Sequence, residues 1–126
     1  MNMARLLLGC GGVMGFLGVA LGAFGAHGLR DRLSESMMAA YQTGVLYHLV
    51  HAVALFSLGL CAQQWQSTAL YGAGWCFVAG ILIFSGSLYI YAVTGVGTWA
   101  MLTPVGGLCF LAGWGFVVFS AFSAAG

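Results

Sequence analysis

Four long apolar stretches alternate with three short polar segments along this chain of 126 residues. The apolar stretches cover about residues 6–26, 43–61, 69–93 and 99–122. Each provides the roughly 20 residues that an α-helix needs to cross the hydrocarbon core of a bilayer. The short connections predict an all-α fold, in which residues 1–126 form a single membrane domain and four transmembrane helices pack as an antiparallel bundle.

The composition places the chain in a membrane as firmly as the pattern does. Hydrophobic residues make up 62% of the sequence and charged residues 4%, with a formal net charge of +1, and the mean hydropathy is +1.03. A water-facing surface is typically about 25% charged, so a soluble fold is excluded. The lipid bilayer is the expected partner, no nucleic-acid partner is expected, and protein partners are left open.

Two segments allow alternative interpretations. The first apolar stretch follows Arg5, as in a signal peptide, but it is longer than the usual apolar core of such peptides, and we interpret it as a mature helix. The charged segment after it has apolar residues at Leu29, Leu33 and Met37, a spacing typical of a short amphipathic helix. This segment either lies on the membrane surface or extends the second span outward.

Small residues recur along one face of the first and last helices. In lipid such stripes let helix backbones approach closely, because apolar side chains gain nothing by leaving a bilayer. We expect these glycines to pack helices together, within one bundle or against another copy in a homo-oligomer: Gly11, Gly15, Gly18, Gly22 and Gly25 in the first helix, and Gly106 and Gly113 in the last.

Polar side chains gather in one half of the predicted membrane layer. The candidate polar pocket consists of His27, Tyr47, His48, His51, Ser85, Ser87, Tyr89, Thr103 and Pro104. Pro104 either lies in the first turn of the last helix, where proline is tolerated, or breaks that helix and opens it toward the pocket.

The histidines allow two interpretations. A buried imidazole can link two helices through hydrogen bonds, and the sequence favours this role. Alternatively His27, His48 and His51 provide three nitrogens for zinc, copper, haem or a quinone, although they match no fixed metal motif. No catalytic arrangement of acids, bases or nucleophiles is recognised, and no cofactor is expected.

Several strings along the chain resemble the small inner-membrane proteins of domain-of-unknown-function family 423, which includes bacterial YgdD-like proteins. These strings are LGAFGAHGL at 21–29, QTGVLY at 42–47, FSGSLY at 84–89, TPVGG at 103–107 and AGW at 112–114. The resemblance implies a four-helix protein of the inner (plasma) membrane whose biochemical activity is undetermined. It carries over no catalytic residue.

The resemblance also bears on the histidines and on orientation. His27 and His51 match positions that are characteristic of the family, whereas the position of His48 is also associated with glutamine. Basic residues in the family's second loop and tail imply that both termini are cytoplasmic, which would put the histidines in the outer leaflet. This chain differs, because Gln63, Gln64 and Gln66 occupy that loop.

We therefore expect a non-enzymatic multi-pass membrane protein. Its polar pocket around His27, His51 and Ser87 either stabilises the bundle or receives a small ligand or a partner. The alternatives are a redox protein that uses the histidines as ligands, and a small permease assembled from several copies.

Overall fold

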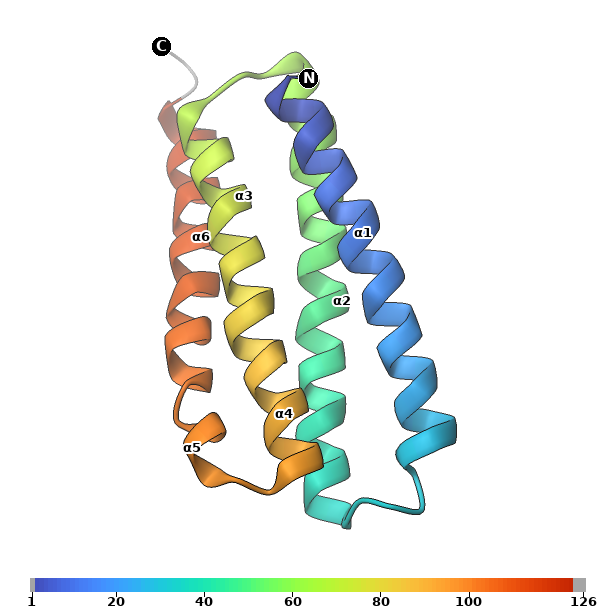
Figure 1. Cartoon of the computed structure of the whole chain (residues 1–126). Helices are drawn as coiled ribbons and strands as arrows, with labels where there is room; N and C mark the ends of the chain where they lie inside the picture. The colour runs from blue at the N-terminus through green and yellow to red at the C-terminus, as the bar shows by residue number, and fades with distance from the viewer. Residues whose placement is uncertain (1, 124–126) are drawn as a thin grey trace.

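The computed structural model describes residues 2–123, which form helices joined by short turns (Figure 1). Two five-residue π-helical segments, η1 and η2, continue α1 and α3 without a break. The elements in chain order are α1 (Met3–Phe24), η1 (Gly25–Leu29), α2 (Glu35–Gln64), α3 (Thr68–Gly80), η2 (Ile81–Ser85), α4 (Gly86–Thr94), α5 (Gly97–Ala100) and α6 (Thr103–Ser123).

Four helical stretches are long and apolar enough to cross a membrane: Met3–Leu29, Glu35–Gln64, Thr68–Thr94 and Gly97–Ser123. Successive stretches run in opposite directions, so the first and last described residues lie at the same end (Figure 1). The predicted all-α, four-helix antiparallel membrane bundle is confirmed.

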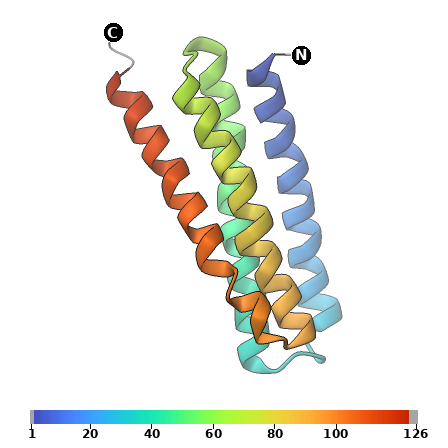
Figure 2. The ribbon, with the colours of Figure 1, turned by 60° about the vertical axis from the view of Figure 1, so that its left-hand side comes forward.

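The bundle has two central and two flanking spans. The span α3–η2–α4 packs between α2 and α6, and α1 packs against the other side of α2 (Figures 1 and 2). In the most apolar window of each central span 39% of the residues are buried, against 17% for α1 and 22% for the last span. The flanking helices therefore present most of their surface to lipid.

Side-chain caps fix where the helices begin. The side chain of Asn2 accepts a hydrogen bond from the Arg5 N–H at 2.9 Å, and the Ser34 hydroxyl accepts one from the Met37 N–H at 3.2 Å. Each cap satisfies a backbone donor that has no partner inside the helix. Because Ser34 caps α2, the residues from Glu35 onward extend the second span. The predicted amphipathic helix over Leu29, Leu33 and Met37 does not form as one element, because η1 ends at Leu29 and Leu33 lies in the connection before α2.

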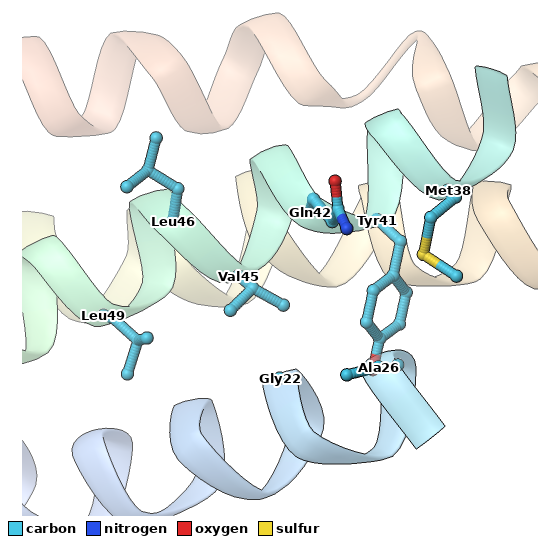
Figure 3. Close-up of a pocket in the computed structure, with 9 residues that line it drawn as sticks. Gly22, Ala26, Met38, Tyr41, Gln42, Val45, Leu46 and Leu49 are labelled. Atoms are coloured by element: carbon cyan, nitrogen blue, oxygen red, sulfur yellow. The ribbon is translucent and has the colours of Figure 1, made fainter. Parts of the chain in front are cut away.

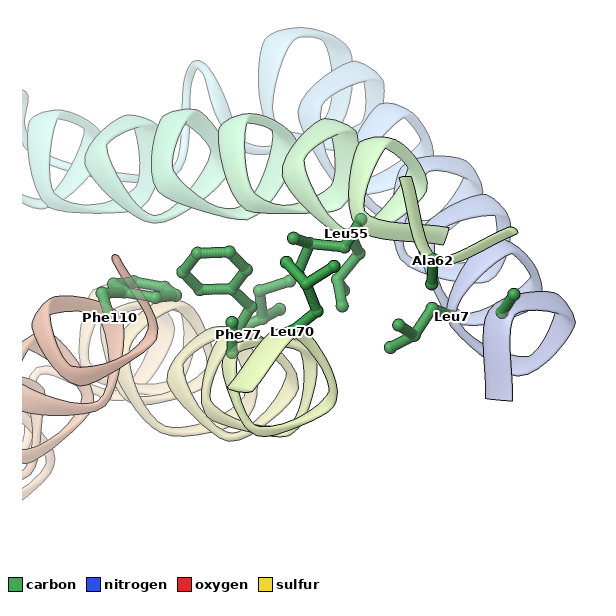
Figure 4. Packing of buried hydrophobic residues seen from close by; sticks show 10 residues of the cluster. Leu7, Leu55, Ala62, Leu70, Phe77 and Phe110 are labelled. Carbon is green, nitrogen blue, oxygen red and sulfur yellow. The ribbon is translucent and has the colours of Figure 1, made fainter. Parts of the chain in front are cut away.

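The largest buried cluster lies where the central spans meet. Leu55 of α2 and Phe77 of α3 are both 0% exposed, and Leu70 packs beside them (Figure 4). Leu7 of α1 and Phe110 of α6 close the cluster on its two sides. All four spans thus contribute to one core, held by dense van der Waals contact.

Glycines let α1 approach α2. A Cβ added at Gly11 would lie 2.6 Å from the backbone nitrogen of Phe56, and one at Gly18 would lie 2.6 Å from a methyl group of Leu49. Gly22 and Gly25 face Val45 and Tyr41 of α2 in the same way. Gly15 differs, since nothing lies within 4 Å of its added Cβ, and its contact with a second copy stays a prediction.

The predicted glycines of α6 also lie at close contacts. A Cβ at Gly106 would lie 2.6 Å from the Cα of Phe84 in η2, and one at Gly113 would lie 2.5 Å from the ring of Phe77 in α3. These two glycines therefore face the neighbouring span of the same chain. They set how closely α6 packs against α3 and η2.

Candidate functional site

His51 is the most fully bonded side chain of the predicted polar pocket. It is 3% exposed, and its Nδ1 lies 2.7 Å from the carbonyl oxygen of Tyr47. Its Nε2 accepts a hydrogen bond from the indole N–H of Trp114 in α6 at 3.0 Å. A carbonyl can only accept, so Nδ1 carries the proton and Nε2 the lone pair. Both ring nitrogens are thereby occupied in the neutral imidazole.

Aromatic rings surround this imidazole. The ring of Phe110 stacks on it with centroids 3.7 Å apart and planes 10° apart, and the ring of Phe77 meets its edge at 5.2 Å. Tyr47 stacks at 6.2 Å on the same helix. The imidazole is therefore held in one orientation by flat contacts as well as by hydrogen bonds.

His48 faces other helices. Its Nδ1 lies 2.8 Å from the Tyr89 hydroxyl of α4, and a Cβ at Gly18 of α1 would lie 3.2 Å from its ring. Its Nε2 is buried without a hydrogen-bond partner among the described residues, although the Met14 carbonyl of α1 is nearby. His48 thus links α2 to α4 and packs against α1 with one nitrogen unpaired.

Hydroxyl groups link the central and last spans in the same half of the bundle. The Ser85 hydroxyl of η2 donates to the Gly44 carbonyl of α2 at 2.7 Å. The Ser87 hydroxyl of α4 lies 2.9 Å from the Phe84 carbonyl and 2.6 Å from the Thr103 hydroxyl of α6. The hydroxyls of Ser85 and Ser87 therefore form hydrogen bonds between elements of the bundle and do not face the lipid.

The structure does not bring the three histidines together. His27 lies in η1 with its side chain exposed. His48 and His51 are about 60° apart around α2, and they contact α4 and α6 respectively. Within residues 2–123 no group of three His, Cys, Asp or Glu side chains is placed to hold a metal ion. The proposed three-histidine ligand set is corrected accordingly, because the side chains diverge.

Pro104 is the second residue of α6, after the turn that separates α5 from α6. It therefore occupies the first helical turn, where its missing N–H breaks no helical hydrogen bond. The last span is nevertheless broken directly before Pro104, because Met101 and Leu102 form a turn between α5, which contains Trp99, and α6. Pro104 also borders the polar region, since it lines a cavity together with Tyr47 and His51.

This cavity belongs to a groove between α2 and α6. It has a volume of about 400 Å³ and is lined from α2 by Tyr47 and His51 and from α6 by Gly107, Phe110 and Trp114. A second cavity of about 330 Å³, also lined by Trp114, lies on the other side of the indole between the same two helices. Trp114 therefore separates the two cavities of the groove, and its hydrogen bond to His51 connects α6 to α2 across the groove.

Trp114 and Phe110 are the site residues that the sequence pattern did not single out. A signal for Trp114 was present, because an indole N–H in the middle of a span must find an acceptor within the protein. Phe110 carried no such signal, since its ring is one of many apolar groups in α6. Its role depends on which face of α6 meets α2.

Comparisons with known proteins agree with this architecture. The family model described as "Protein of unknown function (DUF423)" matches residues 21–107, from the end of α1 into the first turns of α6. The chain belongs to the DUF423 family. The matched residues include the three histidines, Ser85, Ser87, Tyr89, Thr103 and Pro104.

Bacterial relatives cover nearly the whole chain. The UPF0382 membrane protein YwdK of Bacillus subtilis is 40% identical over 88% of this chain and 91% of its own length. The UPF0382 inner membrane protein YgdD of Escherichia coli is 39% identical over 94% of this chain and 90% of its own length. No solved structure matches the chain significantly. The relatives and the four apolar spans identify a multi-pass protein of the inner membrane.

Proposed function

We propose that this DUF423 protein is a non-enzymatic membrane component that binds a small, mostly apolar ligand in the groove between α2 and α6. The observation that supports this proposal best is the cavity of about 400 Å³ beside His51. Its volume falls within the range of about 300–1,000 Å³ that is typical of small-molecule sites. It lies among helices of a membrane bundle, where a ligand can enter from the lipid.

The walls of the cavity favour a flat or branched apolar body. The rings of Phe84, Phe110 and Trp114 line it, and Gly107 leaves room on the α6 side. Two of its polar groups, the His51 imidazole and the Trp114 indole, already bond to each other. The hydroxyl of Tyr47, a residue that is 40% exposed, is the polar group that a carbonyl or hydroxyl of the ligand would meet.

The polar links support a binding role over a catalytic or metal-binding one. Because both nitrogens of His51 are engaged, this imidazole has no lone pair to offer a metal and no free position from which to move a proton. What it does is hold α6 at a fixed distance from α2. The groove is then a preformed site rather than a gap that the helices could close.

A cavity-filling variant tests the proposal. A Cβ at Gly107 would meet only the ring of Phe84, at 3.9 Å, so the side chain of Gly107→Leu has space to enter the cavity. Gly115→Leu is the matched control, because nothing lies within 4 Å of an added Cβ at Gly115 of the same helix. Both proteins are purified in mild detergent, and bound molecules are extracted with organic solvent and identified by mass spectrometry.

The wild type and Gly115→Leu are expected to release the same apolar compound, other than a phospholipid, at close to one molecule per chain. Gly107→Leu is expected to release little of it. Equal amounts from all three proteins, or none from the wild type, would contradict the proposal.

A further inference from the structure

A second groove runs between the end of α1 and the beginning of α2, far along the chain from the α6 groove. Two cavities of about 280 and 290 Å³ share Gly25, Ala26, Met38 and Gln42 in their linings, so they form one continuous groove. Figure 3 shows the side chains of Met38 and Tyr41 reaching from α2 toward Ala26. None of these residues lines the groove between α2 and α6.

The groove exists because α1 carries no bulky side chains there. Gly22 and Gly25 face α2, and the Tyr41 ring fills the space beside Gly25. The Tyr41 hydroxyl donates to the Leu21 carbonyl at 2.5 Å, which fixes α1 against α2 under the groove. The floor is therefore rigid, and the open side faces the surroundings of the bundle.

The polarity of the groove changes along its length. The end near the first loop is lined by the cationic Arg30 and the amide of Gln42. The other end is lined by Val45, Leu46 and Leu49. From Gln42 to Leu49 the α2 axis rises by about 10 Å, so the groove runs from the level of the loop into the apolar part of the span.

We infer that this groove binds one anionic phospholipid. The Arg30 guanidinium would pair with the lipid phosphate, for which its planar set of donors is suited. The amide of Gln42 would bond to the ester region, and an acyl chain would lie along Val45 and Leu49. A cationic end at the loop and an apolar end within the span match the headgroup and the chain of a lipid in their natural order.

The charge that recognises the headgroup comes from one residue. Asp31 and Arg32 on the same loop and Glu35 at the start of α2 are exposed, and none of them lines either cavity. The loop as a whole is close to neutral, so it provides no polybasic surface for lipids in general. Arg30 is distinguished by its place in the groove and not by the net charge around it.

Native mass spectrometry of the purified full chain in detergent tests this inference. The protein is titrated with phosphatidylglycerol or with phosphatidylcholine of identical acyl chains. The first phosphatidylglycerol is expected to bind about five-fold more tightly than phosphatidylcholine, the effect of one basic residue near a headgroup. Arg30→Gln is expected to abolish this preference, whereas Arg32→Gln, which changes the same charge two residues away, is expected to keep it.

A second pair of variants tests the part of the groove that both cavities share, without changing charge. Ala26→Phe puts a ring into the groove, and Ala23→Phe puts one on the exposed surface of the same helix. Ala26→Phe is expected to weaken binding of the first lipid several-fold, and Ala23→Phe to leave it unchanged. Equal affinity for both lipids, equal effects of Arg30→Gln and Arg32→Gln, or a groove covered by a second copy of the chain would overturn the inference.

Discussion

The link between His51 and Trp114 predicts a specific loss of stability in the variant Trp114→Phe. Phenylalanine keeps an aromatic ring between α2 and α6 but removes the indole N–H that donates to His51 Nε2 at 3.0 Å. The imidazole cannot turn toward another partner, because Phe110 stacks on it and the Tyr47 carbonyl holds its Nδ1. Nε2 would then remain buried without a donor.

The size of the effect follows from two contributions. Hydrogen bonds between helices in a membrane stabilise by about 0.6 kcal/mol on average and by up to about 1.7 kcal/mol. An acceptor left buried and unpaired costs about 1–3 kcal/mol. Since His51 is 3% exposed, we expect Trp114→Phe to lower the free energy of unfolding by about 1–2 kcal/mol.

Reversible unfolding in mixed detergent micelles, followed by circular dichroism, measures this free energy. Trp75→Phe is the matched control, because Trp75 is 48% exposed in α3, and its replacement should change the free energy of unfolding by less than about 0.5 kcal/mol. The double variant with His51→Gln isolates the pair, for which we expect a coupling energy of about 1 kcal/mol. A coupling energy near zero, or equal effects of Trp114→Phe and Trp75→Phe, would refute the link.

Two further substitutions test the packing and the second histidine. Gly106→Ala should destabilise the bundle by about 1–3 kcal/mol, because its Cβ would meet the backbone of Phe84. Gly115→Ala is the control and should not destabilise it. Thermal unfolding compares the two variants, and equal melting temperatures would contradict the close approach of α6 to η2. Tyr89→Phe should lower the free energy of unfolding by about 1–3 kcal/mol, since it removes the hydroxyl that lies 2.8 Å from Nδ1 of the buried His48 imidazole. Unfolding in mixed micelles checks this value, and an unchanged stability would show that the Tyr89 hydroxyl does not support the imidazole.

The spans were predictable because their signal is local. Runs of about 20 apolar residues and short connections fix four helices and their alternating direction without any knowledge of packing. The glycines of the first helix were predictable as a set, since their spacing puts them on one face, but the sequence could not show that Gly15 makes no contact while Gly11 touches Phe56. That difference depends on how closely α1 and α2 lie at each level.

The site was less predictable because it depends on helix rotation. The spacing of His48 and His51 allowed a shared ligand, but three residue steps leave them about 60° apart around α2, and they contact different helices. His27 belongs to the same region of the chain, yet it lies on the exposed side of η1. The partners Trp114 and Phe110 come from α6, whose position beside α2 is set by Gly106 and Gly113 against the intervening span.

The groove between α2 and α6 can be tested directly by nuclear magnetic resonance of the indole N–H groups. The protein contains four tryptophans, and Trp114 is the one that lines both cavities of this groove. Protein labelled with ¹⁵N-tryptophan is measured as purified and again after exhaustive detergent washing, with the Trp114 signal assigned from the spectrum of Trp114→Phe. We expect washing to shift the Trp114 signal and to leave that of Trp75 in place. An unchanged Trp114 signal, or equal shifts of all four, would contradict a ligand in this groove.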